Sequence, residues 1–228
     1  MAIYAIGDLH LSFSSDKPMD VFGENWQDYE NKIKKNWMEK IKDEDCVLIP
    51  GDISWALNLE NASEDLDWIN KLPGKKIFVR GNHDYWWSSL KKMKDKYPDM
   101  DFIQNNYTTF GEYCICGSRG WIFPNEVKFS EEDEKIYKRE LLRLRMSLDS
   151  AVKNGCKKII AMIHFPPIFD GETSGFSDIF EEYGVEKVIY GHLHTEESFK
   201  DGYVGMKNGV EYILTSSDYL DFDPIKIL

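Results

Sequence analysis

The five histidines of the chain all come directly after short apolar runs. They are His10 after IYAIGDL, His83 after KIFVRGN, His164 after KKIIAMI, and His192 and His194 in GHLH after EKVIY. Histidines that serve only packing or surface polarity would be scattered over helices and the middles of strands. Because each run has the length and the Ile and Val content of a buried strand, we expect all five imidazoles at the ends of strands.

Acidic and amide side chains occupy positions of the same kind. Asp8 stands in GDLH, Asp52 follows the run CVLIPG, and Asn82 stands in RGNHD. In the segments DLH and HLH, alternate residues share one face of an extended chain, so each segment directs two donors to the same side. The resulting seven candidate metal donors are Asp8, His10, Asp52, Asn82, His164, His192 and His194.

These donors have the chemistry of a two-metal site. Imidazole nitrogen, carboxylate oxygen and amide oxygen suit Mn, Fe or Zn. Seven donors exceed the four of a tetrahedral zinc site and fit two ions that share a bridging carboxylate. The four cysteines stand apart from this set, which disfavours a structural zinc site. Because ligands of open α/β sheets bind where the carboxyl ends of strands converge, donors from distant segments can meet there.

The elements that must position these residues alternate along the chain. Apolar runs of strand length occupy residues 3–6, 46–49, 76–79, 113–116, 159–163, 185–190 and 212–215. Ser130 is the predicted N-cap of the longest helix, whose apolar stripe is Tyr137, Leu141, Leu144, Leu148 and Val152. A second helical pattern spans residues 26–41. Strands that alternate with helices indicate an α/β protein, and the uniform composition favours a single domain, residues 1–228.

The charge and the cysteines restrict partners and location. A net charge of −12 opposes extended nucleic-acid binding, which requires Lys and Arg to displace counterions. A small phosphate ester remains compatible, because bound metal ions set the local field. The four cysteines form no CxxC pair, so we expect buried, reduced thiols. Without a signal-peptide pattern or an apolar stretch of ~20 residues, we expect a cytoplasmic protein with no membrane contact.

Five sequence boxes occur in a fixed order between residues 7 and 194: GDLH, GD, GNHD, MIHFPP and GHLH. Together they resemble the motif set of the calcineurin-like metallophosphoesterases, and the chain is similar to small bacterial phosphodiesterases and phosphohydrolases of that superfamily. The resemblance implies a four-layer α-β-β-α sandwich, with two mixed β-sheets flanked by helices and a metal site at the carboxyl ends of strands. It also implies two divalent or trivalent metal ions, Mn, Fe or Zn.

The resemblance further implies a role for each side chain. One ion would be bound by Asp8, His10 and His194, the other by Asn82, His164 and His192, with Asp52 bridging them. A hydroxide between the ions would attack phosphorus in line. His83 would face the substrate, where it would either stabilise the phosphoryl oxygen or protonate the leaving group. Asp84 would either orient the His83 imidazole as part of the catalytic machinery or hold the backbone.

One departure from the superfamily concerns the residues after Asp52. The Ser/Thr protein phosphatases have Asp-Arg-Gly a few residues after this motif, whereas here ISWALNLE follows, so protein phosphatase activity is not expected. Arg119, in the loop GSRGWIFPNE, is a candidate for binding the substrate phosphate, with a surface salt bridge as the alternative. Trp55 is a candidate wall of the substrate pocket, as are Trp86, Trp87 and Trp121, with ordinary packing as the alternative. The segment SSDYLDF receives no role.

Three function classes follow from these residues. The leading hypothesis is a dinuclear metallophosphoesterase, a hydrolase whose partner is a small phosphate ester, either a phosphodiester or a small phosphomonoester. The alternative is a non-catalytic, metal-binding interaction scaffold on the same fold, for which neither His83 nor a full donor set is needed. A nuclease is opposed by the acidic charge. The sequence defines no protein partner.

Overall fold

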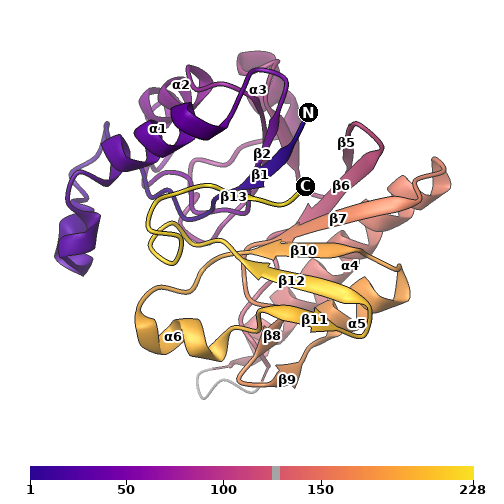
Figure 1. Ribbon diagram of the computed structural model, residues 1–228. Coiled ribbons are helices and arrows are strands. Elements are labelled where there is room, and N and C mark those ends of the chain that lie inside the picture. Colours follow the sequence, from indigo (N-terminus) through magenta and orange to yellow (C-terminus); the bar gives the residue numbers. More distant parts are fainter. Residues whose placement is uncertain (125–128) are drawn as a thin grey trace.

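The computed structural model describes residues 1–124 and 129–228. Two β-sheets pack face to face, and helices cover the outer face of each (Figure 1). This arrangement is the four-layer sandwich of two mixed sheets that the sequence resemblance implied. The loop GSRGWIFPNE ends in residues 125 and 126, which lie outside the described part of the chain.

The first sheet has the strand order β13-β1-β2-β3-β4. Its strands are β1 (Ile3–Ala5), β2 (Cys46–Ile49), β3 (Lys75–Val79), β4 (Asp101–Ile103) and β13 (Ile225–Lys226). Strands β1 to β4 run parallel, and β13 runs antiparallel to β1. The carboxyl ends of β1, β2 and β3 therefore lie side by side, where the sequence places the first candidate donors.

The second sheet has the strand order β11-β12-β10-β7-β6-β5. Its strands are β5 (Thr108–Phe110), β6 (Tyr113–Ser118), β7 (Lys158–Ile163), β10 (Lys187–Tyr190), β11 (Gly205–Lys207) and β12 (Val210–Leu214). The four central strands are parallel, and β5 and β11 pair antiparallel at the two edges. A separate hairpin joins β8 (Ile168–Phe169) to β9 (Glu172–Thr173).

Helices on the two outer faces complete the layers. The first sheet is covered by α1 (Tyr29–Lys40), α2 (Ser63–Asn70) and α3 (Leu90–Lys96), and the second by α4 (Glu131–Lys153) and α5 (Gly175–Glu182). Two 3₁₀ segments, η1 (Met19–Phe22) and η2 (Glu24–Trp26), and the short helix α6 (Glu196–Asp201) belong to the loops. Between the sheets, Leu48, Ile77 and Ile160 belong to one buried apolar cluster that joins both layers. Each such side chain contributes about 1.5–3 kcal/mol by leaving water.

All seven predicted strands are present, as β1, β2, β3, β6, β7, β10 and β12. The predicted start of the longest helix is confirmed, because the hydroxyl of Ser130 accepts the N–H of Asp133, and the Asp133 carboxylate accepts the N–H of Ser130. The predicted apolar stripe is wrong at its last position. Val152 is 47% exposed, and the neighbouring Ala151 takes the buried position in the final turn.

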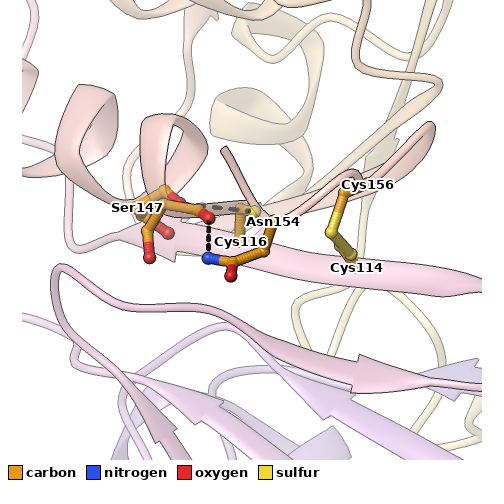
Figure 2. Close-up of a disulfide and its surroundings, with 6 residues drawn as sticks. Cys114, Cys116, Ser147, Asn154 and Cys156 are labelled. Atoms are coloured by element: carbon orange, nitrogen blue, oxygen red, sulfur yellow. Dashed lines mark hydrogen bonds between the residues drawn. A yellow bond between two sulfur atoms is a disulfide. The ribbon is translucent and has the colours of Figure 1, made fainter. Parts of the chain in front are cut away.

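The expectation of four reduced thiols is wrong for one pair. Cys114 of β6 forms a disulfide with Cys156 in the turn that follows α4, with 6.1 Å between the Cα atoms (Figure 2). Parallel pairing of β6 with β7 places Cys114 opposite Ile159, so the turn leading into β7 lies beside it. Cys46 and Cys116 are free and buried, as expected. Cytoplasmic location stays a prediction, and none of the helices formed by residues 1–124 and 129–228 is long and apolar enough to cross a membrane.

Candidate metal centre

The seven candidate donors meet where strands of both sheets end. Asp8 and His10 follow β1, Asp52 follows β2, and Asn82 follows β3, all in the first sheet. His164 follows β7, and His192 and His194 follow β10, in the second sheet. Side chains separated by up to 184 residues come within contact distance here. The strand-end positions expected from the sequence are those observed.

A first cluster consists of Asp8, His10 and His194. Each offers one ligand atom, and these atoms lie within 4.8 Å of one another. The Nε2 atoms of His10 and His194 are 3.2 Å apart, and His194 Nε2 is 3.7 Å from Asp8 Oδ1. Asp8 and His10 are buried. Three converging donors of this kind can hold one metal ion.

A second cluster consists of Asp52, His164 and His192, whose ligand atoms also lie within 4.8 Å of one another. The amide oxygen of Asn82 reaches into it, at 2.7 Å from His164 Nε2 and 3.0 Å from His192 Nδ1. His192 Nδ1 and His164 Nε2 are 3.1 Å apart. This set can hold a second metal ion.

Asp52 lies between the clusters. Its Oδ2 atom is 3.4 Å from His164 Nε2 in the second cluster and 3.8 Å from His10 Nε2 in the first. Its Oδ1 atom accepts the backbone N–H of His83 at 2.8 Å. One carboxylate oxygen is thus held by the loop after β3, while the other faces both clusters.

The backbone at the strand ends is shaped to bring these groups together. Asp8, His10, Asp52 and His192 all adopt left-handed conformations, with φ between 46° and 73°. Such conformations are uncommon for residues other than glycine and concentrate at functional sites. A Cβ atom at Gly191 would collide with the Asp8 carboxylate. The glycine before the HLH segment therefore permits close approach of the β1 and β10 loops.

Two hydrogen bonds orient histidine rings from behind. Nδ1 of His164 donates to the carbonyl oxygen of Pro50 at 3.0 Å, and Nδ1 of His194 donates to Asp218 Oδ1 at 2.9 Å. Both bonds leave Nε2 directed at the clusters, and such partners commonly fix the tautomer of a metal-binding histidine. Asp218, within the segment SSDYLDF, was missed by the sequence analysis. It stands beyond β12, so extending the strand-end criterion from histidines to every acidic residue would have found it.

Burial and charge shift the pKa values of these groups. Burial raises the pKa of Asp8 to about 6 and lowers the pKa of His10 and of His192 to about 3. Burial alone would lower the pKa of His164, but the negative charges of Asp52 and Asp8 outweigh it and raise that pKa to about 9. The positive charge of His164 in turn holds the pKa of Asp52 below its usual range despite burial. The buried carboxylates of Asp8 and Asp52 lie close together here, and a bound cation would compensate their negative charge.

His83 stands outside both clusters and faces a cavity. Its ring centroid is 4.3 Å from that of Trp55 and 5.8 Å from that of His10. Burial lowers the pKa of His83, and the charge of Asp52 opposes this shift. The cavity has a volume of about 660 Å³ and is lined by residues of both clusters and by the apolar side chains Met19, Phe22, Trp26, Trp55 and Phe199. A ligand in it would touch His83 and the metal donors together.

Asp84, proposed from the sequence as a catalytic partner of His83, is fully buried. Its carboxylate accepts the backbone N–H groups of Ile53, Ser54 and Gly81 at 2.8–3.2 Å, and the indole N–H of Trp86 at 2.8 Å. In the described part of the chain none of its hydrogen bonds reaches the His83 imidazole. Of the two roles considered, the structure favours holding the backbone, since Asp84 ties the loop after β2 to the loop after β3.

Arg119 was a candidate for binding the substrate phosphate, but the structure places it away from the cavity beside the clusters. Its side chain is 13% exposed, lies 3.7 Å from Glu140 Oε1, and packs over the ring of Trp121. It lines a separate pocket rather than the cavity beside the clusters. The guanidinium pairs with the buried carboxylate of Glu140 on α4 and not with a group of the cavity.

Among the tryptophans, Trp55 lies in the cavity wall as expected. Its ring stacks on the imidazole of His10 at 5.0 Å between centroids, and its indole N–H points to the sulfur of Met19. Trp86 is buried in the core, and Trp87 packs against Phe102. These two have the packing role that was the alternative. Trp26, read from the sequence as a helical core residue, is buried and also contributes to the cavity.

Comparison with known proteins places the chain in a family. Residues 1–196 match the calcineurin-like phosphoesterases, and the chain belongs to that family. An uncharacterized protein of Methanocaldococcus jannaschii is 29% identical over 116 residues, 45% of this chain. The chain matches 62% of the length of that relative.

Three solved structures are similar in fold. The phosphopantetheinyl hydrolase of Mycobacterium tuberculosis has 14% identity and a TM-score of 0.63, with 100% of this chain and 95% of that chain covered. A protein of unknown function from Aquifex aeolicus has 21% identity and a TM-score of 0.54, with coverage of 99% and 95%. A protein of Thermus thermophilus has 12% identity and a TM-score of 0.58, with coverage of 84% and 81%. Together the family match and the two clusters support a metal-dependent phosphoesterase.

Proposed function

We propose that the chain is a dinuclear metallophosphoesterase that hydrolyses a small phosphate ester. One metal ion would be bound by Asp8, His10 and His194 and the other by Asn82, His164 and His192, and Asp52 would contribute its carboxylate to both. The observation that carries the proposal is the position of Asp52 Oδ2, which lies within 4 Å of a histidine nitrogen of each cluster. A bridging carboxylate requires such a position.

The donors present fit metal ions. Two pairs of imidazole nitrogens, His10 with His194 and His164 with His192, face each other at 3.1–3.2 Å. In each pair a hydrogen bond to a carbonyl or carboxylate at the far side of one ring leaves that ring's inward nitrogen free to donate its lone pair. A cation between the two nitrogens of each pair would be bound by both rings in their neutral form. Nitrogen and oxygen donors of this mixture suit Mn, Fe or Zn.

When bound, two such ions lower the pKa of a shared water toward ~7 and stabilise the charge on the phosphoryl oxygens. The protein residues supply the rest. Asp52 holds the spacing between the two donor sets, and Asp218 fixes the ring of His194. His83 lies at the cavity side of Asp52, with its backbone N–H bonded to that carboxylate. In its protonated form it donates a proton to the leaving oxygen of the ester.

The cavity favours one kind of ester. Its lining among the described residues includes carboxylates and aromatic rings but neither Lys nor Arg. Lys17 lies nearby, 5.8 Å from the Trp55 ring centroid. With no guanidinium to neutralise a second phosphate charge, a phosphodiester with one negative charge suits the cavity better than a phosphomonoester with two. The rings of Trp26, Trp55 and Phe22 offer packing to an apolar or aromatic leaving group.

The test is a substrate panel on purified protein loaded separately with Mn, Fe and Zn. We expect hydrolysis of an aryl phosphodiester to exceed that of the matched aryl phosphomonoester, with about two metal ions per chain by elemental analysis. Absence of both activities together with absence of bound metal would contradict the proposal. That result would favour the alternative, a non-catalytic scaffold. The intact donor set and His83 argue against this alternative, because a scaffold would need neither.

A further inference from the structure

A second pocket, separate from the cavity of His83, is lined by three arginines. Arg80, Arg119 and Arg143 surround a space of about 60 Å³, together with Trp87, Ile103, Gln104 and Glu140. The arginines come from the end of β3, the end of β6 and the middle of α4. Guanidinium groups from distant segments repel one another, so bringing three together requires compensating negative charge.

Glu140 supplies part of that charge. The carboxylate is 1% exposed, accepts a hydrogen bond from Arg143 at 2.7 Å, and lies 3.7 Å from Arg119. Arg139 also approaches it from the surface, at 3.9 Å. Among the groups that line the pocket, three guanidinium charges face one carboxylate, a sum of 3 − 1 = +2.

Some N–H groups of these arginines form no hydrogen bond with the described residues. Nε of Arg119 is buried and has no hydrogen-bond partner among the described residues. Nε of Arg80 donates to the carbonyl oxygen of Asp84 at 3.1 Å, and no other described acceptor bonds to its guanidinium. A buried donor without a partner is unfavourable, so an acceptor in the pocket would stabilise it. Burial and the neighbouring arginines lower the pKa of Arg119 to about 10, which leaves the group charged at neutral pH.

We propose that this pocket binds a small tetrahedral oxyanion of charge −2, such as inorganic phosphate or sulfate. The volume admits a few water molecules and therefore a free oxyanion. Two negative charges balance the local +2, and the oxyanion oxygens accept the unused N–H groups of Arg80 and Arg119. Planar guanidinium groups are the side chains best suited to such bonds.

The position of the pocket connects it to the candidate metal centre. Arg80 directly precedes the segment that carries Asn82 and His83. The carbonyl oxygen of Arg119 accepts the backbone N–H of His164 at 3.0 Å. The oxyanion would thus lie behind two loops that supply donors to the second cluster.

The experiment uses sulfate and phosphate as probes with the full chain, measured by isothermal titration calorimetry and by thermal unfolding. Titrations are made on metal-loaded protein and on chelator-treated protein, with chloride at matched ionic strength as the reference. We expect saturable binding of one sulfate per chain in both forms. Binding that appears only in the metal-loaded form would place the anion at the metal centre and overturn the proposal, as would the absence of saturable binding.

Variants of two arginines on α4 provide the matched comparison. Arg143→Gln removes a pocket arginine that is 34% exposed, and Arg145→Gln removes an arginine two residues further on that pairs with Glu182 at the surface. We expect Arg143→Gln to weaken sulfate binding at least tenfold, since it removes one of the three positive charges that line the pocket. Arg145→Gln should bind as the wild type does. Equal affinities in the two variants, with circular dichroism confirming that both fold, would contradict the assignment.

Discussion

The cavity beside the histidine clusters and the arginine pocket share strand ends but differ in charge and size. The cavity of about 660 Å³ is lined by carboxylates, imidazoles and aromatic rings. The arginine pocket of about 60 Å³ is lined by three guanidinium groups and one carboxylate. The first attracts cations and has room for an organic ester, whereas the second attracts anions and has room for a single small ion.

The segment from Arg80 to Asp84 shows how two such sites arise side by side. Arg80 lines the arginine pocket, Asn82 enters the second metal cluster, and His83 lines the cavity. Asp84 is buried between them and bonds to the backbone of both loops. Adjacent residues thus line two pockets of opposite charge. The direction of each side chain decides which pocket it lines. The net charge of −12 indicates neither site.

The largest effect is expected from removing the bridging carboxylate of the cavity. Asp52→Asn replaces the oxygen that faces both clusters. We expect kcat/KM on an aryl phosphodiester to fall by at least about 10³-fold, the equivalent of several kcal/mol of lost metal-ion stabilisation. Steady-state kinetics with parallel elemental analysis measures this. Sulfate binding in the arginine pocket should be unchanged, and its loss would show that the two sites are not separate.

The next effect concerns the proton donor. His83→Ala should lower kcat by about 10²-fold or more on an ester with a poor leaving group. The loss should be much smaller on a nitrophenyl ester, whose leaving oxygen needs no proton. Metal content should stay at the wild-type value, because His83 lies outside both clusters. Equal losses on the two esters would contradict a role as general acid.

A smaller effect is expected behind the first cluster. Asp218→Asn weakens the acceptor that fixes the His194 ring. Metal affinity should fall by about 10- to 100-fold, while activity at saturating metal stays near that of the wild type. Asp221→Asn, an exposed carboxylate in the same cavity wall, is the matched control and should leave affinity unchanged. Competition with a fluorescent chelator provides the measurement.

The smallest effect separates the two sites by pH. In chelator-treated protein, His10 and His192 are buried with pKa values of about 3, so they stay neutral where the unfolded chain binds protons. These two histidines therefore lower the stability as pH drops below ~6.5, by about 1–2 kcal/mol each between pH 6.5 and 5, whereas Asp8 and Asp84, whose pKa values burial raises to about 6, oppose the loss by binding protons in the folded state first.

Urea unfolding at pH 6.5 and at pH 5 measures this change in stability. The His10→Gln variant should show half of the loss that His10 and His192 cause together in the wild type. The arginine pocket contributes no such dependence, because Arg119 stays charged over this range with a pKa of about 10. A pH dependence of stability in the His10→Gln variant equal to that of the wild type would contradict the account.

The sequence was sufficient to predict that the candidate metal donors follow strands, and its resemblance to the calcineurin-like metallophosphoesterases implied the four-layer fold. Each of Asp8, Asp52 and His164 follows an apolar run, and the end of a buried strand can be read from composition over a few neighbouring residues. Parallel strands then bring their carboxyl ends to one edge, whatever the distance along the chain. The donors were therefore predictable from local patterns together with one general rule of topology.

Edge elements were harder to predict. β4, β11 and β13 are two or three residues long and mix polar with apolar residues, so they show no clear period. The disulfide between Cys114 and Cys156 depends on which strand pairs with β6, which spacing alone does not reveal. Such contacts are set by partners far away in the chain.

Only the tertiary structure decided the roles of the polar loop residues. Asp218 became a partner of His194, Asp84 a tie between two loops, and Arg119 a neighbour of Glu140 on a distant helix. A loop side chain can point to either side of its backbone, and the choice depends on the charges and space that packing places there. The sequence therefore determined which residues reach the strand ends, and the packing of the two sheets with α4 decided which of them line the cavity of the histidine clusters and which line the arginine pocket.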